Sequence, residues 1–234
     1  MTVLTTPQMS DAYIREQIPK YKWFVHVNFG NGIAAASTSW PDEPPNSRHA
    51  GIGKFEFIVR RNLPDLQGKR VLDIGCNCGL IAIHTLRSGA AEVVGVDSER
   101  TWPHWREQAE FVKRALEWRC RTTYNVSYEE ADLRDLPTTN LGTFDVVLAL
   151  NCLYYLEEPQ IEAVMKHVST ISPVFLVQCN TRDHALGRRT SPAFMADAMR
   201  RNGFSRVSVD APWDHPKRGF WPNRYMRPVV VGEV

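Results

Sequence analysis

The chain has 234 residues, 43% of them hydrophobic, which is enough for one α/β domain with a substantial core. Its formal net charge of +2 is too balanced to indicate, from charge alone, a protein that binds nucleic acid or a membrane surface. No apolar stretch is long enough to span a bilayer, the N-terminus lacks the pattern of a signal peptide, and most of the five cysteines lie in or beside predicted buried strands, so we expect reduced thiols and a cytoplasmic location.

The N-terminal part of the chain is predicted to form a lid. Residues 1–65 are assigned to this lid and helical extension, and residues 66–234 to the main domain. Gly30–Gly53 is rich in Gly, Pro, Ser and Asn, which predicts a long loop, either an ordered lid or a dimer arm. The elements around this loop are expected to be a short amphipathic helix over Ser10–Ile18, a strand over Trp23–Val27 and a helix over Phe55–Arg61.

The segment Arg70–Glu99 predicts a βαβ unit. A buried strand over residues 71–74, a glycine loop over 75–79, an apolar helix over 80–86 and a second buried strand over 93–96 follow one another. Asp73 interrupts the first strand just before the loop, and Asp97 ends the second. Two acidic residues therefore come at the carboxyl ends of neighbouring strands, where ligands bind in an open α/β sheet.

Strands and helices continue to alternate after this unit, which predicts an α/β fold. The expected elements are a helix over Pro103–Arg119 with Pro103 in its first turn, strands over Val126–Glu130 and Phe144–Leu150, a helix over Gln160–Ser169, a strand over Val174–Cys179, a helix over Ser191–Asn202 with Ser191 as N-cap, and strands over Val207–Val209 and Met226–Val231. Because no helix separates the last two strands, we expect them to form an antiparallel hairpin at one edge of the sheet.

The glycine loop has the pattern D-x-G-x-x-x-G rather than that of a dinucleotide site. A carboxylate at Asp73 would repel a phosphate at the helix N-terminus, whereas it suits a ligand with an ammonium group. Asp97 suits a ribose diol, because a carboxylate accepts hydrogen bonds from both hydroxyls. Asp132 would lie at the end of the next strand, where an adenine amine could be recognised. An amino-acid end and a ribose without phosphate describe S-adenosylmethionine.

With these residues in place, the chain resembles the class I S-adenosylmethionine-dependent methyltransferases. The resemblance covers about residues 69–231 and rests on the segments VLDIGCNCG, VGVDS, EEADLRDLP and FDVVLALNCLYYL, in this order. It implies a Rossmann-like, seven-stranded, mostly parallel sheet with helices on both faces, a C-terminal antiparallel β-hairpin, and S-adenosylhomocysteine as the product of the cofactor.

The resemblance also implies roles for individual residues. Gly75 and Gly79 would admit the cofactor backbone, Asp132 and Leu133 would contact adenine, and Asn151 would lie under the methionine portion. The complete set of cofactor-binding candidates is Trp23, Lys54, Asp73, Gly75, Asn77, Cys78, Gly79, Asp97, Ser98, Asp132, Leu133, Asn151 and Tyr154.

Further segments resemble one branch of these enzymes, which contains the bacterial tRNA wobble-uridine carboxymethyltransferases. They are KWFVH, NFGNG, GKFE, LQGK, GAAEVVGVDS and LYY. In that branch, a lysine in the position of Lys54 and a tyrosine in the position of Tyr154 touch the group that the sulfonium carries. Two departures count against a tRNA enzyme: the chain lacks the long N-terminal extension, and Tyr155 replaces a histidine. Small-molecule methyltransferases of biosynthetic pathways share the branch.

Methyl transfer needs an acceptor in line with the sulfonium methyl, and an O–H or acidic C–H acceptor also needs a general base. The candidate catalytic residues are His26, His184, Tyr154 and Tyr155. His26 alternates with apolar neighbours, which favours a buried structural histidine, and a solvated loop histidine explains His184 at least as well. For the two tyrosines, we expect packing against cofactor or substrate rather than proton transfer.

The run from Trp213 to Tyr225 mixes aromatic residues, cations and prolines. Trp213, Trp221 and Tyr225 could bind a flat substrate while Arg224 grips a carboxylate, or the loop could pack its own aromatics on the sheet edge. Cys76 and Cys78 have no second pair of ligands at metal-binding spacing, so no metal site is expected.

Three functional hypotheses follow from the sequence. The first is a methyltransferase that acts on a small molecule in secondary-metabolite biosynthesis, by in-line transfer to N, O or C. The second is a tRNA wobble-uridine-modifying transferase, although the low net charge makes nucleic acid a less expected partner. The third is a non-catalytic cofactor-binding partner subunit. We expect no membrane association, and a monomer or a homodimer.

Overall fold

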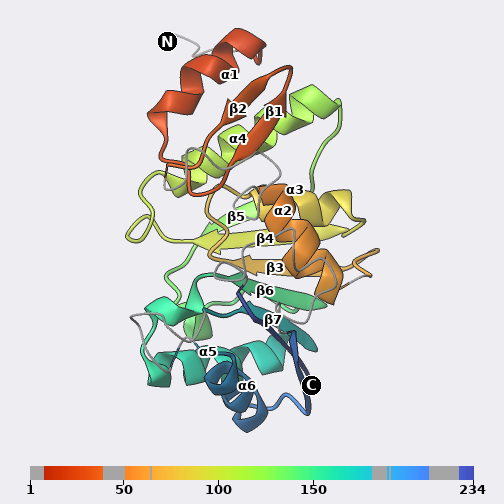
Figure 1. Cartoon of the computed structure of the whole chain (residues 1–234), viewed down its shortest axis with the longest axis vertical. Helices are drawn as coiled ribbons and strands as arrows, with labels where there is room; N and C mark the ends of the chain where they lie inside the picture. Colours follow the sequence, from red (N-terminus) through yellow and green to blue (C-terminus); the bar gives the residue numbers. More distant parts are fainter. Residues whose placement is uncertain (1–7, 39–50, 64, 181–188, 190, 211–226) are drawn as a thin grey trace, which may run out of the picture.

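The computed structural model describes residues 8–38, 51–63, 65–180, 189, 191–210 and 227–234 (Figure 1). Its centre is a seven-stranded sheet in the order β5-β4-β3-β6-β7-β9-β8. The strands are β3 (Arg70–Ile74), β4 (Glu92–Asp97), β5 (Val126–Glu130), β6 (Val146–Leu150), β7 (Val174–Gln178), β8 (Arg206–Asp210) and β9 (Val229–Glu233). The first five are parallel, and β9 is antiparallel to both β7 and β8. The predicted fold class, including the terminal hairpin at one edge, is confirmed.

The chain order reverses between β3 and β6, because β4 and β5 lie on one side of β3, and the later strands lie on the other. Such a switch point opens a crevice at the carboxyl ends of the strands, since the connecting helices leave on opposite faces. Here α3 (Leu80–Arg87) and α4 (Trp105–Cys120) contribute to the apolar cluster on one face, and α5 (Glu158–Ile171) and α6 (Pro192–Arg201) contribute to the cluster on the other.

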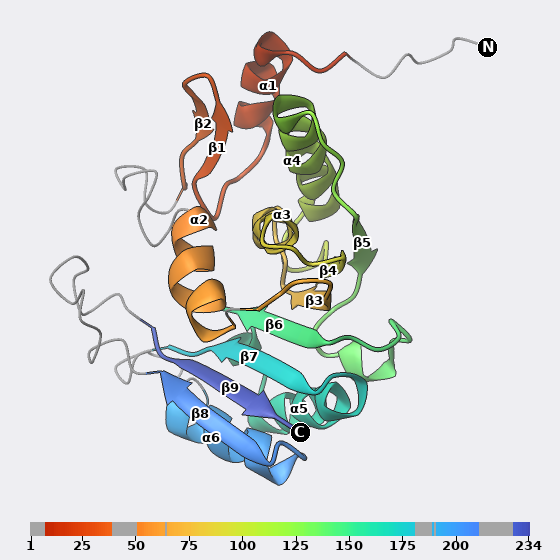
Figure 2. The ribbon, with the colours of Figure 1, turned by 90° about the vertical axis from the view of Figure 1, so that its right-hand side faces the viewer.

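The N-terminal elements pack beside α4 at one end of the molecule, and α5 and α6 lie at the other (Figures 1 and 2). They are α1 (Asp11–Gln17), capped by the Ser10 side chain, and a two-stranded hairpin of β1 (Val27–Gly30) and β2 (Ile33–Ala35). The predicted strand over Trp23–Val27 is therefore wrong except at His26, which forms a β-bridge, and at Val27, where β1 begins. The predicted loop over Gly30–Gly53 is wrong at its start, because Asn31 and Gly32, both with positive φ, form a hairpin turn that leads into β2. Residues 39–50 of this loop lie outside the described residues.

The helix before the sheet begins at Gly51, earlier than predicted, and changes its winding part-way. Residues Gly51–Lys54 are α-helical (α2), and Phe55–Arg60 are π-helical. At its end, Arg61 forms an ion pair with Asp210 at the end of β8, at 2.9 Å. The last turn of the helix thus reaches the edge strand β8, while Phe55, Ile58 and Val59 pack in the apolar cluster on one face of the sheet. The assignment of residues 1–65 to a separate lid stays a prediction.

Two other helix starts show how local capping sets the bounds. The helix predicted from Pro103 begins at Trp105, because His104 before it takes a left-handed conformation with φ of 64°. In α6 the predicted caps are confirmed: the Ser191 side chain accepts the Phe194 N–H, and Gly203 follows the helix with φ of 107°. No helix in the described residues is long and apolar enough to cross a membrane.

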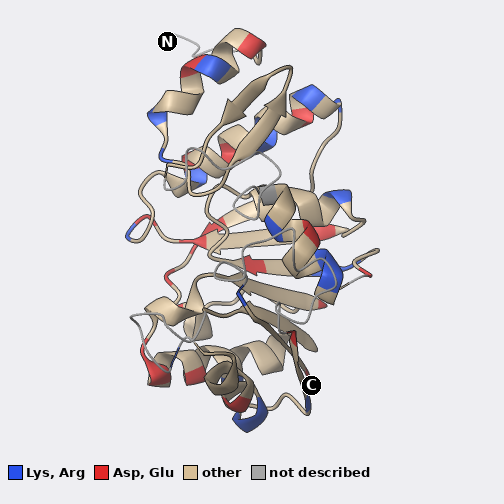
Figure 3. Ribbon diagram, in the orientation of Figure 1, with Lys and Arg blue, Asp and Glu red and all other residues tan. Residues whose placement is uncertain are grey.

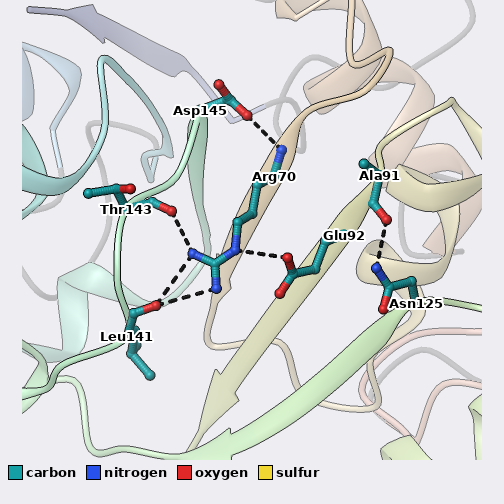
Figure 4. Close-up of polar contacts among 7 residues, drawn as sticks. All are labelled: Arg70, Ala91, Glu92, Asn125, Leu141, Thr143 and Asp145. Atoms are coloured by element: carbon teal, nitrogen blue, oxygen red, sulfur yellow. Dashed lines mark hydrogen bonds and ion pairs between the residues drawn. The ribbon is translucent and has the colours of Figure 1, made fainter.

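The opposite, amino-terminal edge of the sheet is held by Arg70 at the start of β3 (Figure 4). Its Nε donates to Glu92 Oε2 at 2.9 Å, and its Nη1 donates to the carbonyl oxygen of Thr143 at 2.5 Å. The guanidinium also lies over the Phe144 ring, 4.2 Å from its centroid. This one side chain links β3 to β4 and to the segment that enters β6.

Candidate functional site

A cavity of about 380 Å³ opens at the carboxyl ends of β3 to β6. The lining residues come from the glycine loop, from the ends of β4, β5 and β6, and from the N-terminal segment. They are Phe24, Gly75, Asn77, Asp97, Ser98, Thr101, Trp102, Ala131, Asp132, Leu133, Arg134, Leu150, Asn151, Cys152, Tyr155 and Leu156. Eight of the sequence-predicted site residues are among them: Gly75, Asn77, Asp97, Ser98, Asp132, Leu133, Asn151 and Tyr155.

The glycine loop is fixed tightly against the sheet. The N–H groups of Gly75 and Cys76 donate to the carbonyl oxygen of Val96, at 2.8 and 3.0 Å. Gly79 has φ of 70°, and a Cβ there would lie 2.2 Å from the Tyr128 hydroxyl oxygen. Only glycine permits this combination of backbone conformation and close packing. The loop therefore presents its backbone, rather than side chains, at the start of α3.

Asp97 ends β4 and faces both the loop and the cavity. Its Oδ2 accepts the Asn77 N–H and its Oδ1 accepts the Ser98 N–H, each at 2.8 Å. The side chain is buried, and this burial raises the pKa of its carboxyl above the ordinary value. Each carboxylate oxygen keeps a further lone pair, so Asp97 can still accept hydrogen bonds from two hydroxyl groups.

Asp73 lies beneath the loop, only 2% exposed, and its Oδ2 has no hydrogen-bond partner in the part of the chain that the structure describes. Burial is the main cause that raises the pKa of this carboxyl to about 7, and the nearby Asp97 charge adds to it. A buried carboxylate oxygen without a partner is unfavourable unless a ligand supplies a donor. An ammonium group would supply both the donor and the compensating charge.

Asp132 follows β5, and its neighbour Arg134 binds it. The Arg134 Nε donates to Asp132 Oδ1 at 2.7 Å, which lowers the pKa of the Asp132 carboxyl. The carboxylate is thus ionised and held at the rim of the cavity, beside Leu133. This arrangement fits an exocyclic amine over an apolar surface.

A polar cluster follows the end of β6, and its central residue is Arg227, which the sequence reasoning missed. The Arg227 Nη1 donates to Asn151 Oδ1 at 2.6 Å and to the Tyr154 hydroxyl at 3.1 Å. Asn151 itself has φ of 61°, which turns the chain out of β6. Nothing local in the sequence marks Arg227, because it joins the cluster only through the pairing of the late strand β9 with β7.

Lys54 reaches the same region from α2. It is 7% exposed, and its Nζ lies 4.7 Å from the centroid of the Phe24 ring. Burial is the main cause that lowers the pKa of Lys54 to about 7, and the Arg227 charge adds to it. The site thus holds two basic side chains within electrostatic reach of each other, and Lys54 also acts on Asp73.

The other predicted site residues are spread over three places. Trp23 is buried in the N-terminal core, where its indole N–H donates to Ile18, and Cys78 is buried in the same core, so neither lines the cavity. His26 lies on the N-terminal segment, half-buried, with an unpartnered Nδ1, and burial lowers its pKa. Tyr155 lines the cavity and is 63% exposed. His184, Trp213, Trp221, Arg224 and Tyr225 lie outside the described residues.

Phe24, Thr101 and Trp102 also line the cavity but were not predicted. The Phe24 and Trp102 rings meet edge to face, with centroids 6.2 Å apart. The sequence signal that could have identified Phe24 and Trp102 was their aromatic character close to predicted strands. The described residues contain no group of three side chains that could hold a metal ion.

Comparison with known proteins finds a family model and several relatives that match part of the chain. Residues 71–172 match the family model described as a methyltransferase domain. The chain is 36% identical over 133 residues to a ubiquinone biosynthesis O-methyltransferase of Bradyrhizobium diazoefficiens, covering 56% of this chain and 42% of the relative. It is 35% identical over 95 residues to a tRNA U34 carboxymethyltransferase of Pseudomonas savastanoi pv. phaseolicola, covering 41% and 27%. Both matches span less than half the length of the relative.

Solved structures resemble the chain over nearly its whole length. The N-terminal domain of EvdMO1, crystallised with S-adenosylhomocysteine and D-fucose, has a TM-score of 0.64 at 20% identity and covers 97% of this chain and 98% of that one. The magnesium protoporphyrin IX methyltransferase of Synechocystis PCC 6803, with bound S-adenosylhomocysteine, has a TM-score of 0.59 at 14% identity and covers 95% and 94%. At these identities the likeness establishes the fold.

Proposed function

We propose that this chain, whose residues 71–172 match the family model described as a methyltransferase domain, binds S-adenosylmethionine in the strand-end cavity and transfers its methyl group to a small molecule. The observation that carries the proposal is the buried Oδ2 of Asp73, which has no hydrogen-bond partner among the described residues. Asp97 and Asp132 line the cavity at the neighbouring strand ends. These acids suit an ammonium group, a ribose diol and an adenine amine, while a phosphate would be repelled.

The proposed roles of the residues follow from their positions. Asp73 would pair with the amino group of the cofactor, Asp97 would accept from the ribose hydroxyls, and Asp132 with Leu133 would hold adenine. Gly75 and Gly79 would leave room for the cofactor to approach the backbone of the loop. Asn77, Ser98 and Asn151 would complete the polar contacts to the cofactor. When bound, S-adenosylmethionine supplies an electrophilic methyl group on a sulfonium.

The chain would contribute positioning and exclusion of water to the transfer. Phe24 and Trp102 form one wall of the cavity, and Tyr155 lies at the other side with its ring 4.7 Å from that of Tyr154. The buried Tyr154 has its phenol pKa raised by burial, so it would act by packing and hydrogen bonding rather than as a base. A small, flat or compact acceptor fits an enclosure of this kind.

The distribution of charged residues along the described elements also favours a small acceptor. Lys and Arg alternate with Asp and Glu on α1 and on α4, and both signs occur along the described elements (Figure 3). A nucleic-acid enzyme would instead concentrate cations on one face. The names of the relatives include both quinone and porphyrin methyltransferases, which is consistent with a small-molecule acceptor in a biosynthetic pathway.

One observation favours a second candidate, transfer of a carboxymethyl group to tRNA. Arg227 brings a positive charge to Tyr154 and also acts on Lys54, and a carboxylate carried on the donor sulfonium would balance Arg227 and favour the charged form of Lys54. A tRNA U34 carboxymethyltransferase is among the relatives.

Direct binding and transfer measurements test both candidates. Titration calorimetry with S-adenosylhomocysteine should give a single site, and methyl-labelled S-adenosylmethionine should label a phenol, indole, amino acid or sugar. The absence of any cofactor binding would contradict the proposal. Binding of tRNA that weakens steeply with salt, together with a preference for a carboxylated donor, would favour the second candidate.

A further inference from the structure

Gln178 and Asn180 are buried polar residues at the carboxyl end of β7 that the proposed cofactor site leaves unused. They are 6% and 1% exposed. Among the described residues, the Gln178 Oε1 has no hydrogen-bond partner, and neither the Oδ1 nor the Nδ2 of Asn180 has one. A buried amide atom without a hydrogen bond lowers the free energy of unfolding by about 1–3 kcal/mol. Three such atoms on two residues that are two positions apart therefore need an explanation.

Strand register places these residues beside the polar cluster of the site. Gln178 pairs with Leu150 of β6 on one side and with Val229 of β9 on the other. The Cys179 N–H continues the ladder by donating to the Pro228 carbonyl at 2.8 Å. One residue further in this register, Asn180 lies opposite Arg227, which binds Asn151 and Tyr154.

Both amides face the helix that carries Lys54. Leu176 is two residues before Gln178 and belongs to the apolar cluster that includes Phe55 and Val229. Because alternate residues of a strand share a face, Gln178 and Asn180 point to this same face. The two amides, Lys54 and Arg227 therefore lie between α2 and the ends of β6, β7 and β9.

The hydrogen-bonding capacity of the unpaired atoms defines what they would bind. The oxygens of Gln178 and Asn180 can only accept, so a ligand must bring donors. The Asn180 amide nitrogen and the two basic side chains can donate, so the ligand must also offer acceptors. A carboxylate only accepts and an ammonium only donates, whereas a hydroxyl does both.

We propose that Gln178 and Asn180 form the acceptor-binding subsite, and that they bind hydroxyl groups of the methyl acceptor. The subsite lies next to Asn151 and Tyr154, at the same strand ends as the cofactor cavity. The identity of this ligand as the methyl acceptor rests on the proposed function, but the hydroxyl-binding role of the two amides does not.

Stability measurements distinguish a ligand-binding amide from a structural one. Gln178→Met and Asn180→Leu should leave the melting temperature unchanged or raise it, because no hydrogen bond within the chain is lost. Gln108→Met is the matched control. Gln108 is equally buried, but its Oε1 accepts from the Trp102 indole at 3.2 Å, and its Nε2 donates to the Lys22 carbonyl at 3.1 Å. It should lower the melting temperature by about 2–4 °C for each lost hydrogen bond. An equal fall in Asn180→Leu would overturn the proposal.

Binding measurements then test the ligand class, with catechol and D-glucose as hydroxyl-bearing probes and toluene as the apolar control. Wild-type protein, with and without S-adenosylhomocysteine, should bind at least one hydroxyl probe, and Asn180→Leu should weaken that binding about tenfold without affecting S-adenosylhomocysteine. Failure of both probes to bind, or equal binding by wild type and variant, would overturn the subsite. If the wild-type protein does not bind S-adenosylhomocysteine, that result contradicts the proposed function instead.

Discussion

Asp97 accepts the backbone N–H of Asn77 through Oδ2 at 2.8 Å, which joins the end of β4 to the glycine loop. Asn77 has a left-handed backbone with φ of 51°, a conformation that asparagine tolerates better than most residues. One carboxylate thus shapes the loop and faces the cavity at the same time. The geometry of the proposed cofactor site therefore depends on Asp97 in two ways.

Replacing this carboxylate should weaken cofactor binding strongly. For Asp97→Ala we expect a ten- to hundredfold loss of affinity for S-adenosylhomocysteine, about 1.4–3 kcal/mol, because the ribose contacts and the loop contact are lost together. Titration calorimetry measures the dissociation constant of S-adenosylhomocysteine directly. Asp97→Asn, which keeps one acceptor oxygen, should lose less. An unchanged affinity in Asp97→Ala would refute the assignment of the ribose site.

Two glycines with the same φ offer a controlled test of the loop. Gly68 and Gly79 both have φ of 70°, but a Cβ at Gly68 meets nothing within 4 Å, whereas at Gly79 it would lie 2.2 Å from the Tyr128 hydroxyl. Gly68→Ala should cost only the left-handed strain, about 1–2 kcal/mol of unfolding free energy. Gly79→Ala should destabilise the fold further and also reduce S-adenosylhomocysteine binding. Equal losses in urea denaturation would mean that the close packing has no effect.

The buried Asp73 should give the protein a pH-dependent stability. Its folded-state pKa, about 7, lies above the value of 3.8 expected when unfolded. The contribution of the Asp73 carboxyl to the free energy of unfolding is therefore fully present below about pH 4 and is lost as the pH rises through 7. Asp73→Asn should remove this loss, so that the variant is about 1–3 kcal/mol more stable than wild type at pH 8, yet binds S-adenosylmethionine more weakly.

Urea denaturation between pH 4 and pH 8 checks this expectation through the difference between variant and wild type. Asp197→Asn is the control, because Asp197 is 61% exposed and pairs only with Arg200 among the described residues. A difference for Asp73→Asn that changes no more with pH than the difference for Asp197→Asn would show that the Asp73 carboxylate is not destabilised by burial.

Arg70 should matter for stability and not for binding, because it holds the edge of the sheet opposite the cavity. Arg70→Met is expected to lower the free energy of unfolding by about 1–2 kcal/mol, since the partly buried acceptors on Glu92 and Leu141 lose their donor. Affinity for S-adenosylhomocysteine should stay at the wild-type value. Arg206→Met serves for comparison: Arg206 is 78% exposed and paired with Glu233, so its loss should amount to less than about 0.5 kcal/mol.

Much of the sheet could be predicted because its information is local. Apolar runs such as residues 146–150 indicate buried parallel strands. Asp73 and Asp97 each come at the carboxyl end of such a run, and they indicate the ends of β3 and β4. The Ser191 cap and Gly203 likewise act on their immediate neighbours. These signals depend on a few adjacent residues, so no knowledge of the tertiary structure was needed.

The errors and omissions arose where distant residues decide the outcome. The turn at Asn31-Gly32 was hidden within a longer stretch rich in Gly and Pro, and β2, which it creates, is mainly alanine. Arg227 reaches Asn151 and Tyr154 only because β9 inserts between β7 and β8. The unpaired state of Asn180 is a property of its whole surroundings, which no local pattern records.

The π-helical winding over Phe55–Arg60 has a consequence for how this helix can vary in length. A π-helical turn accommodates one residue more than an α-helical turn, so loss of a single codon here would let the helix revert to α-helical winding without a break. Five α-helical residues turn through about the same angle as six π-helical residues, so the residues on the two sides of the deletion would keep nearly the same relative rotation. Lys54 would still point toward Phe24, and the helix would become shorter by one residue. This part of the cavity wall can therefore vary in length by one residue without a change in the direction of Lys54.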